Sequence, residues 1–167
     1  MTAVFAGELL SQTKTVLAIL KSRHLLLATA ESCTGGLLAA LITEVPGSSE
    51  VFERGFVTYS NSAKSELLHV AAELIERHGA VSDQVALAMA EGALANSRAH
   101  VAVSITGIAG PGGGTKQKPV GLVHLACVEL GRTPILRRLA LGDQPRSAIR
   151  EASIVEALQL LQLQAER

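Results

Sequence analysis

Hydrophobic residues recur at the three- and four-residue spacing of an amphipathic helix in several stretches of the chain. The first stretch covers residues 8–21, and the clearest one follows Ser82, which is a good N-cap residue. One face of that second helix carries Val85, Ala86, Met89, Ala90, Ala93 and Leu94. Further helices are expected from Leu37 to near Pro46, across residues 61–76 with a break near Val70, and after a cap at 142–143.

Short apolar runs between these helices predict five strands, at residues 24–30, 52–60, 99–105, 120–129 and 134–141. A turn around Gly131 joins the last two strands as a hairpin. Because helices and strands are interleaved, we expect an α/β fold, a three-layer α/β/α sandwich. Its sheet is expected to be mixed and mostly parallel, with an antiparallel hairpin late in the chain. No linker or repeat divides the sequence, so residues 1–167 are predicted to form one domain.

Composition narrows the classes of function. Hydrophobic residues make up 48% of the chain, which is enough for one core, and aromatic residues make up only 2%, so that core is aliphatic. The formal net charge is zero, which argues against binding nucleic acid through bulk electrostatics. The start lacks a signal-peptide pattern and no apolar run reaches membrane-spanning length, so we expect a cytoplasmic protein without membrane contact. The two cysteines and five histidines show no metal-ligand spacing, so neither a metal nor a cofactor is expected.

Four segments follow or lie close to the ends of predicted strands, where ligands bind in open α/β sheets. The first is residues 30–36, between a strand and a helix. Backbone N–H groups at a helix start favour an anion, and Ser32, Cys33 or Thr34 could be a nucleophile. Equally, Thr34 could cap the helix and the glycines could only permit a tight turn.

Two further segments carry hydroxyl groups and a lysine. Ser49 lies in a Pro-Gly-Ser-Ser turn, which on its own reads as an ordinary turn. Tyr59 ends a predicted strand, and Lys64 falls in the first turns of the next helix, where the helix dipole and partial burial would lower the pKa of a lysine. A neutral lysine can activate a serine hydroxyl, whereas a solvated surface lysine would have no such role.

The fourth segment is the glycine-rich stretch at 106–116, whose backbone could form an anion-binding nest or a floppy connection. It lacks the Gly-Lys-Ser/Thr ending of a Walker loop, and it leads to a strand rather than to the helix of a dinucleotide-binding motif. Arg146 and Arg150 share one face of the last helix and could hold a phosphate or be ordinary surface charge.

Together these motifs resemble the CinA C-terminal family. The resemblance rests on AESCTGG at 30–36, VTYSN at 57–61 with Lys64, HGAVS at 78–82, ITGIAGPGG at 105–113 and KPVG at 118–121. It covers roughly residues 9–161 and is closest to the stand-alone form of the family, which has no molybdopterin-binding-like half. That form implies hydrolysis of nicotinamide mononucleotide, a pyridine mononucleotide, to nicotinic acid mononucleotide and ammonia without a metal.

The same resemblance implies roles for individual residues. Ser49 is the implied nucleophile, Lys64 its base, and Tyr59 the residue that orients the lysine or protonates the leaving ammonia. Ser32 is the alternative nucleophile, and it orients the carboxamide if Ser49 attacks. The residues implied to bind substrate are Thr34, Gly35, Thr106, Gly107, Ala109, Gly110, Gly112, Gly113 and Arg146. The inserted Gln144 and Pro145 depart from the family pattern and weaken the assignment of Arg146.

Two other functions remain open from the sequence. One is a nucleotide-sensing or competence-associated binding module, which would not need Ser49, Tyr59 and Lys64 in combination. The other is a Cys33 thiol enzyme, which would require a histidine nearby in space. By resemblance we also expect a homodimer or a higher homo-oligomer.

Overall fold

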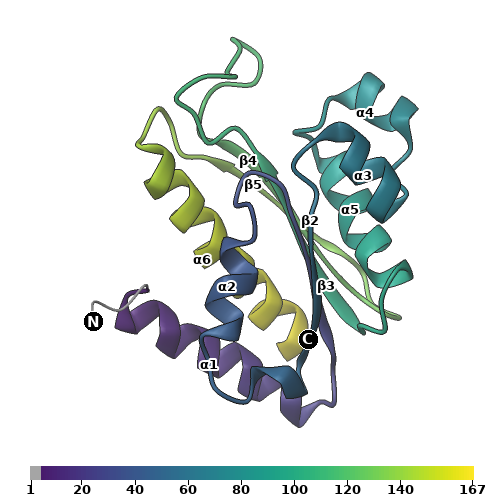
Figure 1. The fold of residues 1–167 in the computed structure, drawn as a ribbon, viewed down its shortest axis with the longest axis vertical. Helices are drawn as coiled ribbons and strands as arrows, with labels where there is room; N and C mark the ends of the chain where they lie inside the picture. The colour runs from purple at the N-terminus through teal and green to yellow at the C-terminus, as the bar shows by residue number, and fades with distance from the viewer. Residues whose placement is uncertain (1–4) are drawn as a thin grey trace.

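The computed structural model describes residues 5–167 as a five-stranded sheet between two layers of helices (Figure 1). The elements follow in the order α1 (Gly7–Ser22), β1 (Leu27–Glu31), α2 (Leu37–Thr43), the short 3-10 helix η1 (Ser48–Glu50), β2 (Phe52–Val57), α3 (Asn61–Leu68), α4 (Ala72–His78), α5 (Asp83–Ala95), β3 (Val101–Gly107), β4 (Leu122–Glu129), β5 (Ile135–Ala140) and α6 (Arg146–Glu166). Helices α1, α2 and α6 cover one face of the sheet, and α3, α4 and α5 cover the other. The predicted three-layer sandwich is confirmed.

The sheet has the strand order β2-β1-β3-β4-β5 and is mixed, as expected. Strand β1 pairs in parallel with both β2 and β3, whereas β4 is antiparallel to both β3 and β5. The antiparallel part therefore begins one strand earlier than the predicted hairpin. The reason is that the glycine-rich segment after β3 returns directly to β4 without a crossover helix, which a parallel pair would require.

The two faces of the sheet carry side chains of different size. Valine, leucine and isoleucine of β3 and β4 face α1, α2 and α6, and alanines of β1, β3 and β4 face α5. Small side chains on both partners let α5 pack closely against the sheet. Gly92 of α5 is equally confined, because a Cβ atom there would lie 2.0 Å from the carbonyl oxygen of Leu68. Among the described residues the fully buried core is thus aliphatic, and Phe5, Phe52 and Phe56 pack against it while partly exposed.

Several predicted boundaries are wrong by a few residues. Strand β1 begins at Leu27 rather than at His24, whose positive φ of 54° interrupts an extended backbone. The break near Val70 is confirmed, because His69 adopts φ 56° between α3 and α4. The predicted cap at residues 142–143 is wrong: Pro145 is the N-cap of α6, and no side chain caps it.

Within the described residues 5–167, no helix combines the length and the hydrophobicity that a membrane span requires.

Candidate active site

The carboxyl ends of β1, β2 and β3 meet at one edge of the sheet, and the candidate residues gather there. The N–H of Ser32, just after β1, donates to the carbonyl of Ile105 in β3. The N–H of Thr58, just after β2, donates to the carbonyl of Glu31. After β1 the chain crosses toward β2, and after β3 it turns away toward β4, so this edge is a topological switch point, where ligands bind in open sheets.

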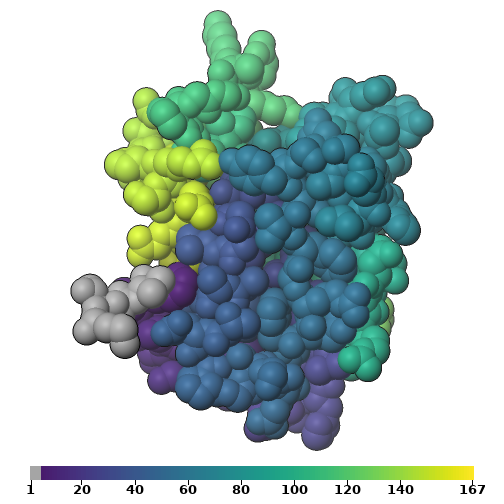
Figure 2. Space-filling view, in the orientation of Figure 1, coloured from purple at the N-terminus to yellow at the C-terminus, as the bar shows by residue number. Residues whose placement is uncertain are grey.

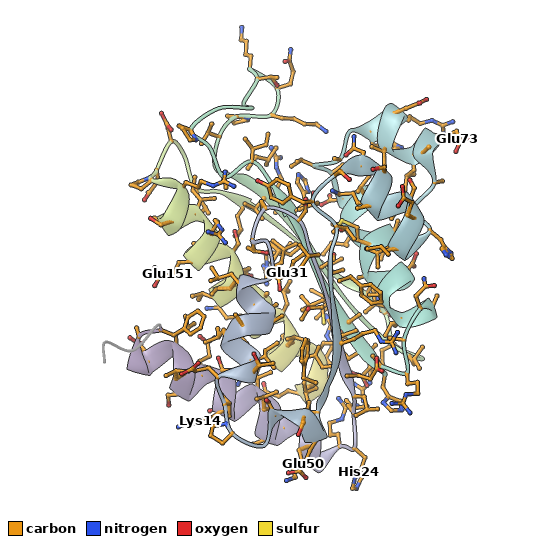
Figure 3. All side chains as sticks on the ribbon, in the orientation of Figure 1. Lys14, His24, Glu31, Glu50, Glu73 and Glu151 are labelled. Atoms are coloured by element: carbon orange, nitrogen blue, oxygen red, sulfur yellow. The ribbon has the colours of Figure 1, made fainter. Side chains whose placement is uncertain are left out.

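The loop that follows β1 is held by the buried carboxylate of Glu31. Its oxygens accept hydrogen bonds from the backbone N–H groups of Gly36, Leu38 and Ala39 at 3.2, 3.1 and 2.9 Å. In Figure 3 the Glu31 label marks this carboxylate between the two helical layers. The negative charge satisfies N–H groups at the start of α2 that would otherwise lack partners. Residues 32–36 are thereby fixed over the end of β1.

Lys64 is the central residue of the site. It lies in α3, whose N-cap Ser60 accepts a hydrogen bond from the Ala63 N–H at 3.0 Å. The Lys64 side chain is only 1% exposed. Its Nζ donates to the Oγ of Ser32 at 3.1 Å and to the carbonyl oxygen of Thr58 at 2.9 Å. An amine and a serine hydroxyl are thus in hydrogen-bond contact in an enclosed place.

Burial lowers the pKa of Lys64 from its ordinary value, because the charged ammonium loses its hydration. The neighbouring Cys33 opposes this effect only in part. Both hydrogen bonds of Nζ go to uncharged oxygens, so neither supplies the opposite charge that would favour the ammonium form. A larger fraction of Lys64 is therefore neutral and able to accept a proton than for a lysine in water.

The structure does not bring Ser49 and Lys64 together, which corrects the expected pair of nucleophile and base. Ser49 lies exposed in η1, before β2 begins, whereas Lys64 follows the end of β2. The six residues of β2 lie between them, and at about 3.3 Å per residue such a strand spans roughly 20 Å. Neighbouring Glu50 forms an ion pair with Lys21 at 2.8 Å, and in Figure 3 Glu50 lies beside His24, at the far end of the molecule from Glu31's loop.

Tyr59 is likewise placed differently from its expected role beside the lysine. Its ring is 62% exposed, and its hydroxyl accepts a hydrogen bond from Nη2 of Arg146 at 2.8 Å. Nη1 of Arg146 donates to the carbonyl of Gly110 at 2.7 Å. The carbonyl of Thr58 accepts a hydrogen bond from Lys64, whereas the side chain of Tyr59, the next residue, is exposed. Tyr59 and Arg146 thus form a bridge from β2 to the glycine-rich loop, despite the inserted Gln144 and Pro145.

The predicted substrate-binding residues after β3 share the same edge. Thr106 is buried, and its hydroxyl donates to the carbonyl of Ala80 at 2.8 Å. Gly107 ends β3, Ala109 is buried, and Gly110 and Gly113 adopt positive φ values of 72° and 84°. Figure 2 shows this green loop projecting beyond the rest of the molecule. A hollow of about 580 Å³ lies along its outer side, lined by residues 111–116 and by the segment after β5. Gly112 and Gly113 line that hollow, whereas Ser32 and Lys64 do not.

The second arginine of α6 contacts the loop after β1. Nη2 of Arg150 donates to the carbonyl oxygen of Thr34 at 2.8 Å, and a Cβ atom on Gly35 would lie 3.9 Å from the same Nη2. The Thr34 side chain is fully buried, and its hydroxyl has no hydrogen-bond partner within residues 5–167. The Thr34 hydroxyl is therefore a buried polar group that no protein atom of the described residues satisfies.

Cys33 is a neutral thiol in this environment. Burial raises its pKa to about 11, and the positive charges of Arg146 and Arg150 only partly offset this effect. Cys33 and Cys127 are both free and buried, and among residues 5–167 no three His, Cys, Asp or Glu side chains are arranged to hold a metal ion.

Because the Cys33 thiol stays protonated near neutral pH, it is not expected to act as a nucleophile. Cys33→Ala should keep the ammonia release that the family resemblance implies within about threefold of the unchanged protein, since it removes only one small buried atom. Treatment with iodoacetamide at pH 7.5, followed by an activity assay, provides the companion measurement. Loss of activity in Cys33→Ala, with the fold intact by circular dichroism, would instead support the thiol-enzyme alternative.

Comparison with known proteins identifies the family. The family model described as the CinA C-terminal domain matches residues 10–164. The chain belongs to the CinA C-terminal domain family. Among solved structures, the CinA relative from Agrobacterium tumefaciens, titled competence/damage inducible protein CihA, has a TM-score of 0.95 at 45% identity. That match covers 99% of this chain and 100% of the other.

Relatives of two lengths match this CinA domain. The nicotinamide-nucleotide amidohydrolase PncC of Escherichia coli strain K12 is 48% identical over 155 residues, which cover 93% of each chain. The CinA-like protein of Anaeromyxobacter sp. is 52% identical over 148 residues, 89% of this chain but 36% of that protein. The chain thus spans about a third of the longer CinA relatives, including the putative competence-damage inducible protein of Caldicellulosiruptor bescii.

The sequence patterns assign no role to two residues that shape this CinA site, Glu31 and Lys118, and assign a third, Arg150, a different one. Glu31 lies inside the AESCTGG motif, and a carboxylate just before a Gly-Gly helix start is a signal for N–H binding. Arg150 is expected from its spacing to Arg146 to hold a phosphate or to be surface charge, whereas in the structure it donates to the Thr34 carbonyl. Lys118 donates through Nζ to the carbonyl oxygens of His78 and Val81, and no local pattern indicates such a distant contact.

Proposed function

We propose that this protein hydrolyses the carboxamide of nicotinamide mononucleotide to nicotinic acid mononucleotide and ammonia, with Ser32 as nucleophile and Lys64 as general base. The observation that carries the proposal is the 3.1 Å contact between Lys64 Nζ and Ser32 Oγ in a buried place. The substrate is suggested by the Escherichia coli relative, whose name is nicotinamide-nucleotide amidohydrolase and which matches over nearly its whole length.

In the first half of the reaction, Ser32 Oγ attacks the carboxamide carbon while its proton passes to neutral Lys64 Nζ. The backbone N–H groups of Cys33 and Thr34, which the Glu31 carboxylate does not use, stabilise the negative charge on the carbonyl oxygen. The C–N bond then breaks, and Lys64 returns the proton to the departing nitrogen, which leaves as ammonia. The nicotinoyl group is left as an ester of Ser32.

In the second half, water replaces ammonia. Lys64 accepts a proton from the water, the hydroxide attacks the ester carbonyl, and the proton returns to Ser32 Oγ when the carbon–oxygen bond breaks. The products are nicotinic acid mononucleotide and free enzyme. The Thr58 carbonyl, 2.9 Å from Nζ, keeps the amine aimed at Ser32 throughout.

The remaining residues of the site suit the nucleotide part of the substrate. The glycine-rich loop offers backbone N–H groups to the 5′-phosphate at positions where positive φ values shape the turn, as at Gly110 and Gly113. Arg146 lies between that loop and Tyr59 and supplies a positive charge at the same place. Thr34 and Gly35 are placed to contact the carboxamide end.

The proposal is tested by following ammonia release from nicotinamide mononucleotide by purified protein, with and without EDTA. We expect release at the same rate in both, with nicotinic acid mononucleotide as the second product. Activity lost in EDTA and restored by Zn²⁺ would contradict the metal-independent mechanism. No release under any condition, together with measurable nucleotide binding, would contradict the amidase proposal and favour the binding module.

A further inference from the structure

A lysine remote from Ser32 joins the glycine-rich loop to the opposite helical layer. Lys118 lies on the arm of the loop that returns toward β4, and its Nζ donates to the carbonyl oxygens of His78 and Val81, the latter at 2.8 Å. His78 is the last residue of α4, where unpaired carbonyl groups and the helix dipole favour a positive charge. The Lys118 side chain thus reaches from the loop to the turn between α4 and α5.

The same turn receives a second contact from the site. The Thr106 hydroxyl donates to the carbonyl of Ala80 at 2.8 Å, so the beginning and the returning arm of the glycine-rich loop attach to one four-residue turn, residues 78–81. That turn is itself tied to α5, since the Ser82 hydroxyl donates to the Gly79 carbonyl at 2.9 Å.

Gly79 leaves room for the lysine. It adopts a φ of 74°, and a Cβ atom there would lie 2.6 Å from Lys118 Nζ. Any side chain at this position would therefore both strain the backbone and displace the ammonium group. The turn is shaped to receive the Lys118 side chain.

Other contacts hold the base of the loop and its first arm, which is the segment that leaves β3. Backbone hydrogen bonds between Ile108 and Gly121 close the base, and Arg146 holds the first arm at Gly110. On the returning arm the Lys118 N–H donates to the Thr115 hydroxyl at 3.0 Å, which adds only a local turn. Apart from that turn and the packing of Val120 against the core, the Lys118 ammonium supplies the side-chain hydrogen bonds among the described residues that tie the returning arm to the body of the protein.

We infer that Lys118 is a positioning residue that holds the glycine-rich loop in the conformation that binds the substrate's phosphate. The inference rests on the proposed function, because it concerns the residue that positions the phosphate-binding part of that site. Lys118 acts through the loop: two hydrogens of its ammonium already go to carbonyl oxygens of the α4–α5 turn. Its loss leaves Ser32 and Lys64 in place and affects binding rather than the chemical step.

The test uses Lys118→Met, with Lys118→Arg as the conservative variant and Lys14→Met, an exposed lysine of α1 outside the described site, as the matched control. We expect Lys118→Met to raise KM for nicotinamide mononucleotide about tenfold, which is the usual scale for one charged hydrogen bond, with kcat changed by less than about twofold. Lys118→Arg restores part of the affinity, because a guanidinium can donate to two carbonyls, and Lys14→Met behaves like the unchanged protein.

Hydrogen exchange of the free protein separates positioning from direct contact. We expect faster amide exchange in residues 109–117 of Lys118→Met and unchanged exchange in α5 and the sheet. If Lys118→Met folds poorly, Gly79→Ala provides a second test, because it displaces the same ammonium group and is expected to give the same result. A raised KM with unchanged loop exchange would mean that Lys118 touches the substrate itself, and an unchanged KM would overturn the inference outright. If the unchanged protein releases no ammonia, the proposed function fails, and loop exchange alone then decides whether Lys118 positions the loop.

Discussion

Ser32→Ala will abolish ammonia release from nicotinamide mononucleotide, whereas Ser49→Ala will leave it within about twofold of the unchanged protein. Ser32 Oγ is the hydroxyl in contact with the buried amine of Lys64, and alanine removes the atom that is proposed to attack the carboxamide. Loss of a nucleophile that acts together with its base lowers kcat by about 10⁴-fold or more. Steady-state ammonia release at saturating substrate measures both variants.

Ser49→Ala is the matched control because it deletes the same hydroxyl group from an exposed turn at the other end of β2. Mass spectrometry after rapid quenching offers an independent check, since a nicotinoyl nucleotide ester should be found on Ser32 alone. If both Ser49→Ala and Ser32→Ala kept full activity, neither serine would be the nucleophile. If Ser49→Ala were inactive with its fold intact, Ser49 would again be the candidate nucleophile. Its base would then have to be a group other than Lys64 of the same chain.

Lys64→Met is the second large effect, because it should remove activity without destabilising the fold. Methionine matches the length of the lysine stem and fills the same buried space, but it cannot accept the Ser32 proton. The lowered pKa of Lys64 means that the folded protein holds the ammonium less favourably than the unfolded chain does. We therefore expect a thermal midpoint for Lys64→Met equal to or above that of the unchanged protein, with kcat lower by at least about 10³-fold.

The pH dependence follows from the same lowered pKa. The base works in its neutral form, so kcat/KM should rise with pH as Lys64 loses its proton and level off at a pH below the ordinary pKa of lysine. Because the folded-state pKa is below the unfolded one, the unfolded chain binds more protons between the two values, and Lys64 disfavours folding most at low pH. The stability gained in Lys64→Met should accordingly shrink as pH rises through that window.

Lys64→Arg provides the opposing control. A guanidinium stays charged throughout the accessible pH range, so this variant should be inactive and, unlike Lys64→Met, less stable than the unchanged protein. Chemical denaturation of the three proteins at pH 7 and pH 9 compares them directly. A Lys64→Met protein that is markedly less stable than the unchanged one would show that the lysine is held as a stabilising ammonium, and the proposed base would then be wrong.

The sequence motifs indicate the position of the candidate site more securely than the contacts within it. The motifs around Ser32, Lys64 and Thr106 were each placed near predicted strand ends, and the structure brings their segments to one edge of the sheet. The structure does not bring Ser49 to Lys64, because the two residues are close in sequence but separated by the length of a strand. Ser32 lies 32 positions from Lys64, yet the parallel pairing of β1 with β2 sets the ends of both strands side by side.

What the sequence by itself determined is the local structure: amphipathic helices, apolar strands, the Ser82 cap and the glycine-rich segment all follow from short-range spacing and side-chain chemistry. What only the tertiary structure decided is which distant groups touch, and therefore which serine meets the lysine, why Tyr59 meets Arg146, and where Lys118 reaches. The physical reason is that strand order and direction set these contacts through long-range packing. The burial that lowers the pKa of Lys64 arises only when α3 closes against the end of β1.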